Sequence, residues 1–178
     1  MPMDLASYNR LGQVYCAANV SAKSVIAVTT AMTGVILYNP PGSGKVLLIA
    51  DCGFAWTTTP AATHNIGLAL GAVSPTLPTS TTAIGSGVKQ ANGSGNAGAS
   101  VALAYDAATL PAAPVAARWF GGSAYQAATA AGVTVANYYL VDKVDGALIV
   151  VPGSSLSFTV VTTTAVGLGS VSWVEVPL

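Results

Sequence analysis

The sequence predicts an all-β protein: an antiparallel β-sandwich or barrel with long loops rich in Gly, Thr and Pro. Short segments rich in Val, Ile, Thr and aromatic residues recur about nine or ten times along the chain, and turn residues separate them. Strands do not alternate with long helices, which excludes a parallel, doubly wound sheet. Charged residues make up only 7% of the 178 residues, too few for long amphipathic helices or a coiled coil.

The first ten residues precede the first convincing strand. We therefore divide the chain into an N-terminal arm, residues 1–10, and a single β-sandwich domain, residues 11–178. The arm carries Leu5, Tyr8 and Arg10 among polar residues. Its pattern is too short and irregular for a helix that buries one face, so we expect an extended arm, with a frayed terminus as the alternative. Because free arms become ordered only when they dock, these three residues are candidates for contact with a partner.

Apolar and β-branched runs predict the strands of the N-terminal half. Between them, the cluster Asn-Pro-Pro-Gly-Ser-Gly at 39–44 can continue neither a strand nor a helix, and it predicts a tight loop. Ile and Leu alternate with small residues between 65 and 70, which is typical of a half-buried strand. The strands predicted here are 12–20, 24–30, 35–38, 45–56 and 65–70.

The middle of the chain has a different character. Residues 71–98 are rich in Pro, Thr, Ser and Gly and predict a long loop region with one short strand at 83–89. Loops of this length in a compact domain are usually functional or mobile. A strand follows at 100–105, and a Pro-rich break comes at 110–114. The Ala-rich segment 123–131 fits either one short helix that ends at Gly132 or an ordered loop.

The C-terminal third carries the clearest strand pattern, with strands predicted at 135–141, 147–151, 156–163 and 167–176. Asp145-Gly146 is a good signal for a hairpin between the first two of these strands. Trp56, Phe158 and Trp173 all lie in predicted strands. We expect these three side chains to be largely buried, inside the sandwich or at a contact between subunits.

Composition excludes several classes of protein. Six Lys and Arg balance six Asp and Glu without clustering, whereas a nucleic-acid partner requires clustered cations. A hydrophobic content of 52% without net charge is the opposite of the signature of disorder. No run of about 18 apolar residues predicts a membrane-spanning helix, so we expect no membrane partner. The first four residues lack the features of a signal peptide, and we expect synthesis in the cytoplasm.

Two glycine-rich segments resemble nucleotide-binding motifs but lack their context. In Gly42-Ser43-Gly44-Lys45, the first glycine that a phosphate-binding loop requires is replaced by Asn39, and Lys45 is followed by Val46 and a predicted strand. Residues 93–98 match the dinucleotide fingerprint letter by letter, but no βαβ unit surrounds them. We expect both segments to be loops, and we expect no cofactor site.

The ionisable side chains form no catalytic or metal-binding pattern. His64 is the only histidine, and we predict that it is a polar loop residue. With Cys16 and Cys52 distant in sequence, it cannot complete a zinc site with the usual number of ligands. We expect both cysteines to be free, with a disulfide possible if their strands are adjacent.

Paired carboxylates of the kind that a glycosidase uses are also not evident. Asp106, Asp142 and Asp145 lie beside predicted turns, and capping of those turns accounts for them better. We expect no catalytic and no metal-binding residue, and hence no enzyme.

Aromatic residues are the best candidates for a contact. Arg118-Trp119-Phe120 places a cation beside two aromatic rings. This triplet fits a sugar or partner contact, or alternatively two core aromatics with a surface arginine. Tyr138-Tyr139 is a second aromatic pair. The low charge also implies that part of the surface is covered by other chains, because the cores of assembly surfaces are poor in charge.

Three segments resemble small jelly-roll proteins of tailed bacteriophages. Residues 145–158, Asp-Gly-Ala-Leu-Ile-Val-Val-Pro-Gly-Ser-Ser-Leu-Ser-Phe, and residues 171–178, Val-Ser-Trp-Val-Glu-Val-Pro-Leu, are similar to the closing strands of those proteins. Residues 33–48 are similar to their early hairpin, with Asn-Pro followed by Gly-Ser-Gly-Lys and an apolar strand. The resemblance implies an antiparallel β-sandwich of jelly-roll type, and a capsid decoration, or cement, protein that is typically trimeric and has no catalytic residues.

The expected function is therefore binding. On this reading the chain forms a homotrimer on the virion surface, binds the major capsid protein and stabilises the outside of the shell through many weak contacts. The alternative is a carbohydrate- or receptor-binding β-sandwich module of a phage fibre or a cell-surface protein. That alternative needs exposed aromatics gathered in one concave patch, whereas aromatics buried between chains favour the cement protein.

Overall fold

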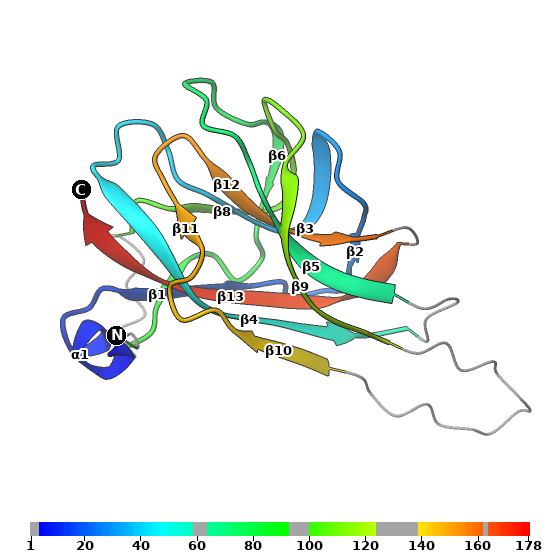
Figure 1. Ribbon diagram of the computed structural model, residues 1–178, viewed down its shortest axis with the longest axis horizontal. Coiled ribbons are helices and arrows are strands. Elements are labelled where there is room, and N and C mark those ends of the chain that lie inside the picture. The colour runs from blue at the N-terminus through cyan, green and yellow to red at the C-terminus, as the bar shows by residue number, and fades with distance from the viewer. Residues whose placement is uncertain (1–3, 59–63, 93–99, 124–138, 162–163) are drawn as a thin grey trace, which may run out of the picture.

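Two antiparallel β-sheets packed face to face make up almost all of the protein (Figure 1), so the predicted all-β sandwich is confirmed. The computed structural model describes residues 4–58, 64–92, 100–123, 139–161 and 164–178. No helix in these ranges is long and apolar enough to cross a membrane.

The first sheet has seven strands. Five follow the order β10-β4-β13-β1-β7, while β11 pairs with β4 and β2 pairs with β13. Its strands are β1 (Val14–Ala18), β2 (Lys23–Val25), β4 (Lys45–Trp56), β7 (Lys89–Gln90), β10 (Tyr139–Lys143), β11 (Ile149–Val150) and β13 (Ala165–Pro177).

The second sheet has six strands in the order β6-β8-β3-β12-β5-β9. Its strands are β3 (Ala31–Tyr38), β5 (His64–Leu70), β6 (Thr79–Ala83), β8 (Leu103–Thr109), β9 (Val115–Ser123) and β12 (Ser155–Val160). Every residue of β12, in the middle of this sheet, is buried.

The strand pairing is that of a jelly roll. Among the eight principal strands, β1 pairs with β13, β3 with β12, β4 with β10, and β5 with β9. Along the chain these are the first with the eighth, the second with the seventh, the third with the sixth and the fourth with the fifth. Such nested pairing arises when one long hairpin wraps into two sheets of four strands. Strands β6, β7 and β8 lie in the connection between β5 and β9 and widen the two sheets.

The predicted hairpin at Asp145-Gly146 is wrong. Both residues have positive φ and form a tight turn in which the Ala147 amide donates to the Val144 carbonyl at 2.9 Å. However, β10 and β11 on either side of this turn both run antiparallel to β4, along the same edge. The Val144 and Asp145 amides donate to the Ala50 carbonyl of β4. The turn therefore interrupts one edge strand and does not reverse the chain.

Other differences lie where the sequence is rich in small residues. The strand predicted at 83–89 is instead the pair β6 and β7, which flank a turn. Strand β9 was not predicted, because its many Ala and Gly residues give no clear alternation. Strand β8 lies a few residues later than the predicted strand at 100–105. The candidate helix at 123–131 lies almost entirely outside the described residues, as does the start of the strand predicted at 135–141.

The N-terminal segment is helical, and the prediction of an extended arm is wrong. Helix α1 (Leu5–Arg10) begins at Asp4, whose carboxylate accepts a bond from the Ser7 amide at 3.4 Å. Such a cap satisfies one of the free amides at the start of a helix. The helix lies beside β1 (Figure 1), and none of its residues is buried.

The core lies between the two sheets and is centred on aromatic side chains. Trp56, Phe158 and Trp173 are 6%, 0% and 0% exposed, so the prediction that they are buried is confirmed. The Phe54 ring lies 5.1 Å from Trp56 and 6.3 Å from Phe158. Gly167 makes room for this cluster, because a Cβ there would lie 2.6 Å from the Cζ atom of Phe54.

Candidate functional site

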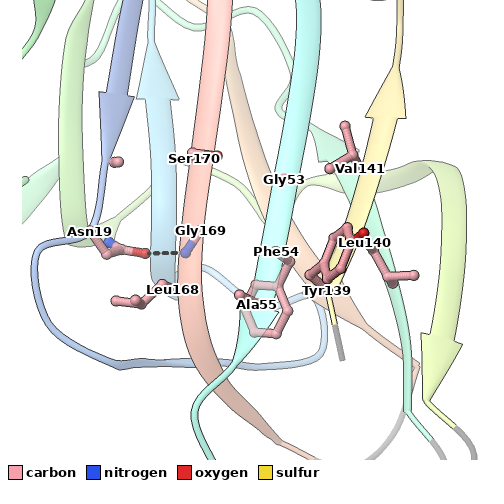
Figure 2. A pocket seen from close by; sticks show the side chains of 11 residues that line it. Asn19, Gly53, Phe54, Ala55, Tyr139, Leu140, Val141, Leu168, Gly169 and Ser170 are labelled. Carbon is pink, nitrogen blue, oxygen red and sulfur yellow. Dashed lines mark hydrogen bonds between the residues drawn. The ribbon is translucent and has the colours of Figure 1, made fainter. Parts of the chain in front are cut away.

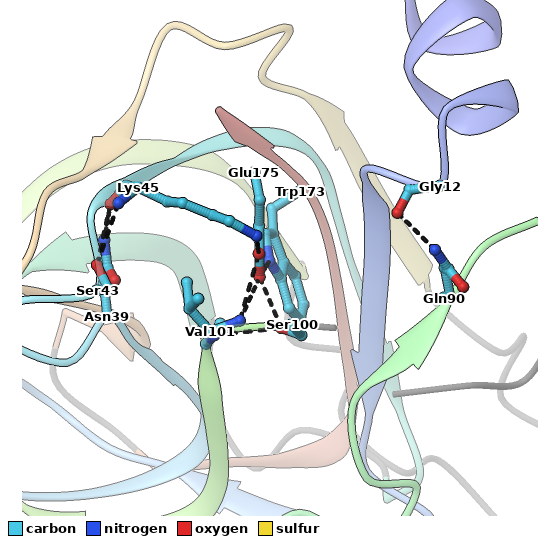
Figure 3. A network of polar contacts seen from close by, with 10 residues as sticks. Gly12, Asn39, Ser43, Lys45, Gln90, Ser100, Val101, Trp173 and Glu175 are labelled. Carbon is cyan, nitrogen blue, oxygen red and sulfur yellow. Dashed lines mark hydrogen bonds and ion pairs between the residues drawn. The ribbon is translucent and has the colours of Figure 1, made fainter. Parts of the chain in front are cut away.

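The only glutamate of the chain is a structural residue. Glu175 on β13 is 1% exposed and accepts a bond from Lys45 Nζ at 2.9 Å. It also accepts bonds from the Ser100 hydroxyl at 2.6 Å, the Val101 amide at 3.0 Å and the Trp173 indole at 3.5 Å (Figure 3). These bonds hold the segment before β8 against the first sheet. A carboxylate with this many partners is stabilised in place.

Two further ion pairs join the sheets, and they correct the assignment of two aspartates to turn capping. Asp106 is buried in β8 and lies 3.1 Å from Lys23 Nζ of β2, and it accepts a bond from the Asn19 amide at 2.7 Å. Asp142 of β10 accepts two bonds from Arg118 of β9, at 2.6 and 2.9 Å. The hydrogen bond to Asp142 raises the pKa of Arg118. Of the three aspartates, Asp145 alone lies in a turn.

The histidine and the two cysteines lie on three different strands. His64 is the first residue of β5, so its placement in a loop was wrong by one residue. Cys16 on β1 and Cys52 on β4 are both free, because β13 lies between their strands. Burial raises the pKa of both thiols, most strongly that of Cys52. Within the described ranges, no group of three or more His, Cys, Asp or Glu could hold a metal ion.

Of the two motif-like segments, only the one at 41–44 lies within the described residues. Residues 41–44 form the loop between β3 and β4, as predicted, and the Asn39 amide fixes its base by donating to the Lys45 and Val150 carbonyls, both at 2.9 Å. The loop runs into a strand and not into a helix. Residues 93–98 lie outside the described residues.

The sheet-A groove, as we name it here, is an open depression on the outer face of the first sheet (Figure 2). It has a volume of about 350 Å³. Two cross-strand rows form its floor and walls, Leu168–Ala55–Tyr139 and Ser170–Gly53–Val141. Tyr139 is 74% exposed and Val141 is 66% exposed. No charged residue lines the groove.

The predicted contact residues do not converge on one site. Leu5 and Tyr8 are half-buried and Arg10 is exposed on α1, beside the first sheet. Arg118, Trp119 and Phe120 lie on β9 in the second sheet. Arg118 is held by Asp142, Trp119 is 47% exposed, and the Phe120 side chain lies outside the described part.

In the described part of the chain, the two exposed aromatics line different depressions. Trp119 and Tyr139 belong to different sheets, and Tyr138 lies outside the described residues. Tyr139 lines the sheet-A groove, and Trp119 is not among the residues that line it.

The surface carries more large apolar side chains than charges. All twelve charged residues of the chain lie in the described ranges, and five of them are exposed: Asp4, Arg10, Lys89, Lys143 and Asp145. Fifteen large hydrophobic side chains are exposed in the same ranges. Composition predicted a surface poor in charge. It could not predict that half of the charged residues form ion pairs within the fold, because that pairing depends on the tertiary structure.

Comparisons with known proteins provide no family assignment. No protein-family model matches the chain, and neither the curated proteins nor the solved structures include a significant match.

Proposed function

We propose that this chain is a structural protein that decorates the outside of a phage capsid. It forms a homotrimer, binds the major capsid protein and resides on the virion surface. The observation that carries the proposal is the surface of the described residues, on which fifteen large apolar side chains and only five charged ones are exposed. Surfaces that are buried in assemblies lose charge at their centre.

The sheet-A groove supports a role in assembly. Its floor consists of small residues, Gly53, Ala55 and Ser170, and its walls are apolar. Because the floor residues are small and uncharged, another chain can approach closely with little desolvation of charge. We assign the groove to contacts between copies of the chain, and α1, with Leu5 and Tyr8, to contact with the shell.

The fold is compatible with this role. Jelly rolls occur in viral capsid proteins, lectins and cupins, and a fold alone does not determine function. The phage assignment rests on the resemblance of residues 33–48, 145–158 and 171–178 to decoration proteins.

The test is binding to an assembled shell. The gene beside the coding sequence is identified, and the major capsid protein encoded there is expressed and assembled into empty shells. The chain should co-sediment with these shells to a saturable occupancy. If the neighbouring genes encode no capsid protein, or if the chain stays in the supernatant with assembled shells, the proposal is wrong.

A further inference from the structure

Trp119 is the exposed tryptophan of this protein. The other two indoles, those of Trp56 and Trp173, lie in the core, whereas Trp119 is 47% exposed on β9 at the edge of the second sheet. An exposed tryptophan leaves a large apolar ring in water. Neither the core nor the sheet-A groove accounts for this exposure, because Trp119 belongs to neither.

The Trp119 indole packs directly against the backbone of the neighbouring strand at Gly67. Trp119 pairs with Gly67 of β5, and a Cβ at Gly67 would lie 2.5 Å from Cε3 and 3.0 Å from Cδ2 of the ring. The ring therefore lies against the glycine, in space that any other residue would fill. The strand pairing shifts register next to this pair, and bulges of this kind re-aim side chains at sheet edges. The residue nevertheless remains 47% exposed.

A hollow of about 440 Å³ lies beside the ring, lined by Asn65, Trp119, Gly121 and Val161. We name it the Trp119 hollow. Asn65 is exposed and offers an amide that both donates and accepts hydrogen bonds. None of the twelve charged residues lines the hollow, and Arg118, the cation next in sequence, is held by Asp142 at 2.6 and 2.9 Å.

From this combination we infer that the Trp119 hollow is a binding site for a neutral sugar. A pyranose ring presents an apolar C–H face, which stacks on the indole, and hydroxyl groups, which bond to the Asn65 amide. An anionic ligand would find no free cation in the hollow, and an apolar peptide side chain would leave the amide unused. The inference does not depend on the proposed capsid role, since a decoration protein and an unrelated β-sandwich could both carry such a site.

Tryptophan fluorescence tests the site directly, because Trp56 and Trp173 are buried. The probes are neutral hexasaccharides of β-1,4-glucose, α-1,4-glucose, β-1,4-N-acetylglucosamine and α-1,6-mannose, with a heparin hexasaccharide as the anionic control. At least one neutral probe should shift the emission saturably, with a Kd of about 1 mM or tighter, and should protect the indole from acrylamide. The anionic probe should not.

Variants then locate the binding, measured by titration calorimetry. Trp119→Ala should abolish it, Trp119→Phe should retain part of it, and Asn65→Ala should weaken it about tenfold. Tyr139→Ala removes an exposed aromatic from the other sheet and is the matched control, with unchanged affinity expected. Circular dichroism verifies that each variant is folded.

Three results would overturn the inference. One is the failure of all four neutral probes to bind. The second is binding that survives in Trp119→Ala. The third is an indole already shielded from acrylamide in the protein alone, since this would mean that another chain covers the hollow.

Discussion

At the scale of single residues, most charged side chains near the core have structural roles. Glu175, Asp106 and Asp142 each form an ion pair with a cation, and the last two pairs join the two sheets. Breaking a buried ion pair by removing one partner is destabilising, because the other charge loses its compensation. Three of the six carboxylates of the chain are thus engaged in ion pairs that hold the fold.

Replacement of Glu175 by Gln should destabilise the protein by about 3 kcal/mol, because the amide cannot accept all of the bonds that the buried carboxylate accepts and Lys45 loses its partner. Urea unfolding measures the change. Asp145→Asn is the matched control, since it removes one exposed negative charge in a turn that tolerates Asn and should change stability by less than about 0.5 kcal/mol. Equal effects of the two substitutions would contradict the structural role of Glu175.

Cys52 should make stability sensitive to alkaline pH. Its thiol has a pKa well above the ordinary value of 9.0 in the folded state, because burial disfavours the thiolate. Below pH 9 both states are protonated, and the thiol contributes no pH dependence. Above pH 9 the unfolded chain releases the proton and the folded chain retains it, so the free energy of unfolding falls.

The comparison with Cys52→Ala isolates this contribution. Over the first pH unit above 9, wild type should lose about 1 kcal/mol more than the variant. Parallel pH curves for the two proteins, measured by urea unfolding, would show that Cys52 ionises equally easily in both states.

At the scale of elements, the conformation of a short segment depends on the strands that it packs against. The turn at Asp145-Gly146 has the positive φ angles of a hairpin turn, yet its flanking strands both follow β4. Helix α1 has one capping aspartate and six residues, too few to be stable alone. Its position beside β1 therefore matters more than its intrinsic helix propensity.

Removal of residues 1–10 should leave the sandwich folded, with a loss of less than about 1.5 kcal/mol, because no residue of α1 is buried. Binding to the capsid shell should weaken in the same variant. Thermal unfolding and co-sedimentation measure the two effects. Unchanged occupancy on the shell would mean that the helix is not the point of attachment.

At the scale of the whole molecule, the surface predicts association. Tyr139 and Val141 form one wall of an uncharged groove on the outer face of the first sheet, and both side chains are largely exposed. Large exposed apolar areas on soluble proteins usually mark interaction sites.

Light scattering at micromolar concentration should give three times the chain mass of 17.6 kDa. Val141→Lys places a charge in the sheet-A groove and should shift the protein toward monomer. Val73→Lys is the matched control, because Val73 and Val141 are both 66% exposed and Val73 lies outside the groove. A monomer in wild type would exclude the trimer, and a trimer that survives Val141→Lys would move the contact elsewhere.

The sequence by itself determined the class of the fold. Val-, Ile- and Leu-rich runs such as 45–56 and 167–176 identify strands because a pleated, half-buried surface selects those residues, and they place Trp56 and Trp173 in the core. Composition also indicated a surface poor in charge. These features are local or additive, so they can be recognised without knowing which strand lies beside which.

Only the tertiary structure decided the pairing and the candidate sites. Residues 115–123 form strand β9 because they pair with β5, although their Ala and Gly residues carry little strand preference. Several features join segments that are far apart in the chain: the ion pairs of Asp106 and Asp142, the sheet-A groove, and the packing of the Trp119 ring against Gly67. The nested pairing of a jelly roll brings together strands that are far apart in the chain, even the first and the last. The residues of such a contact therefore follow no fixed spacing in the sequence.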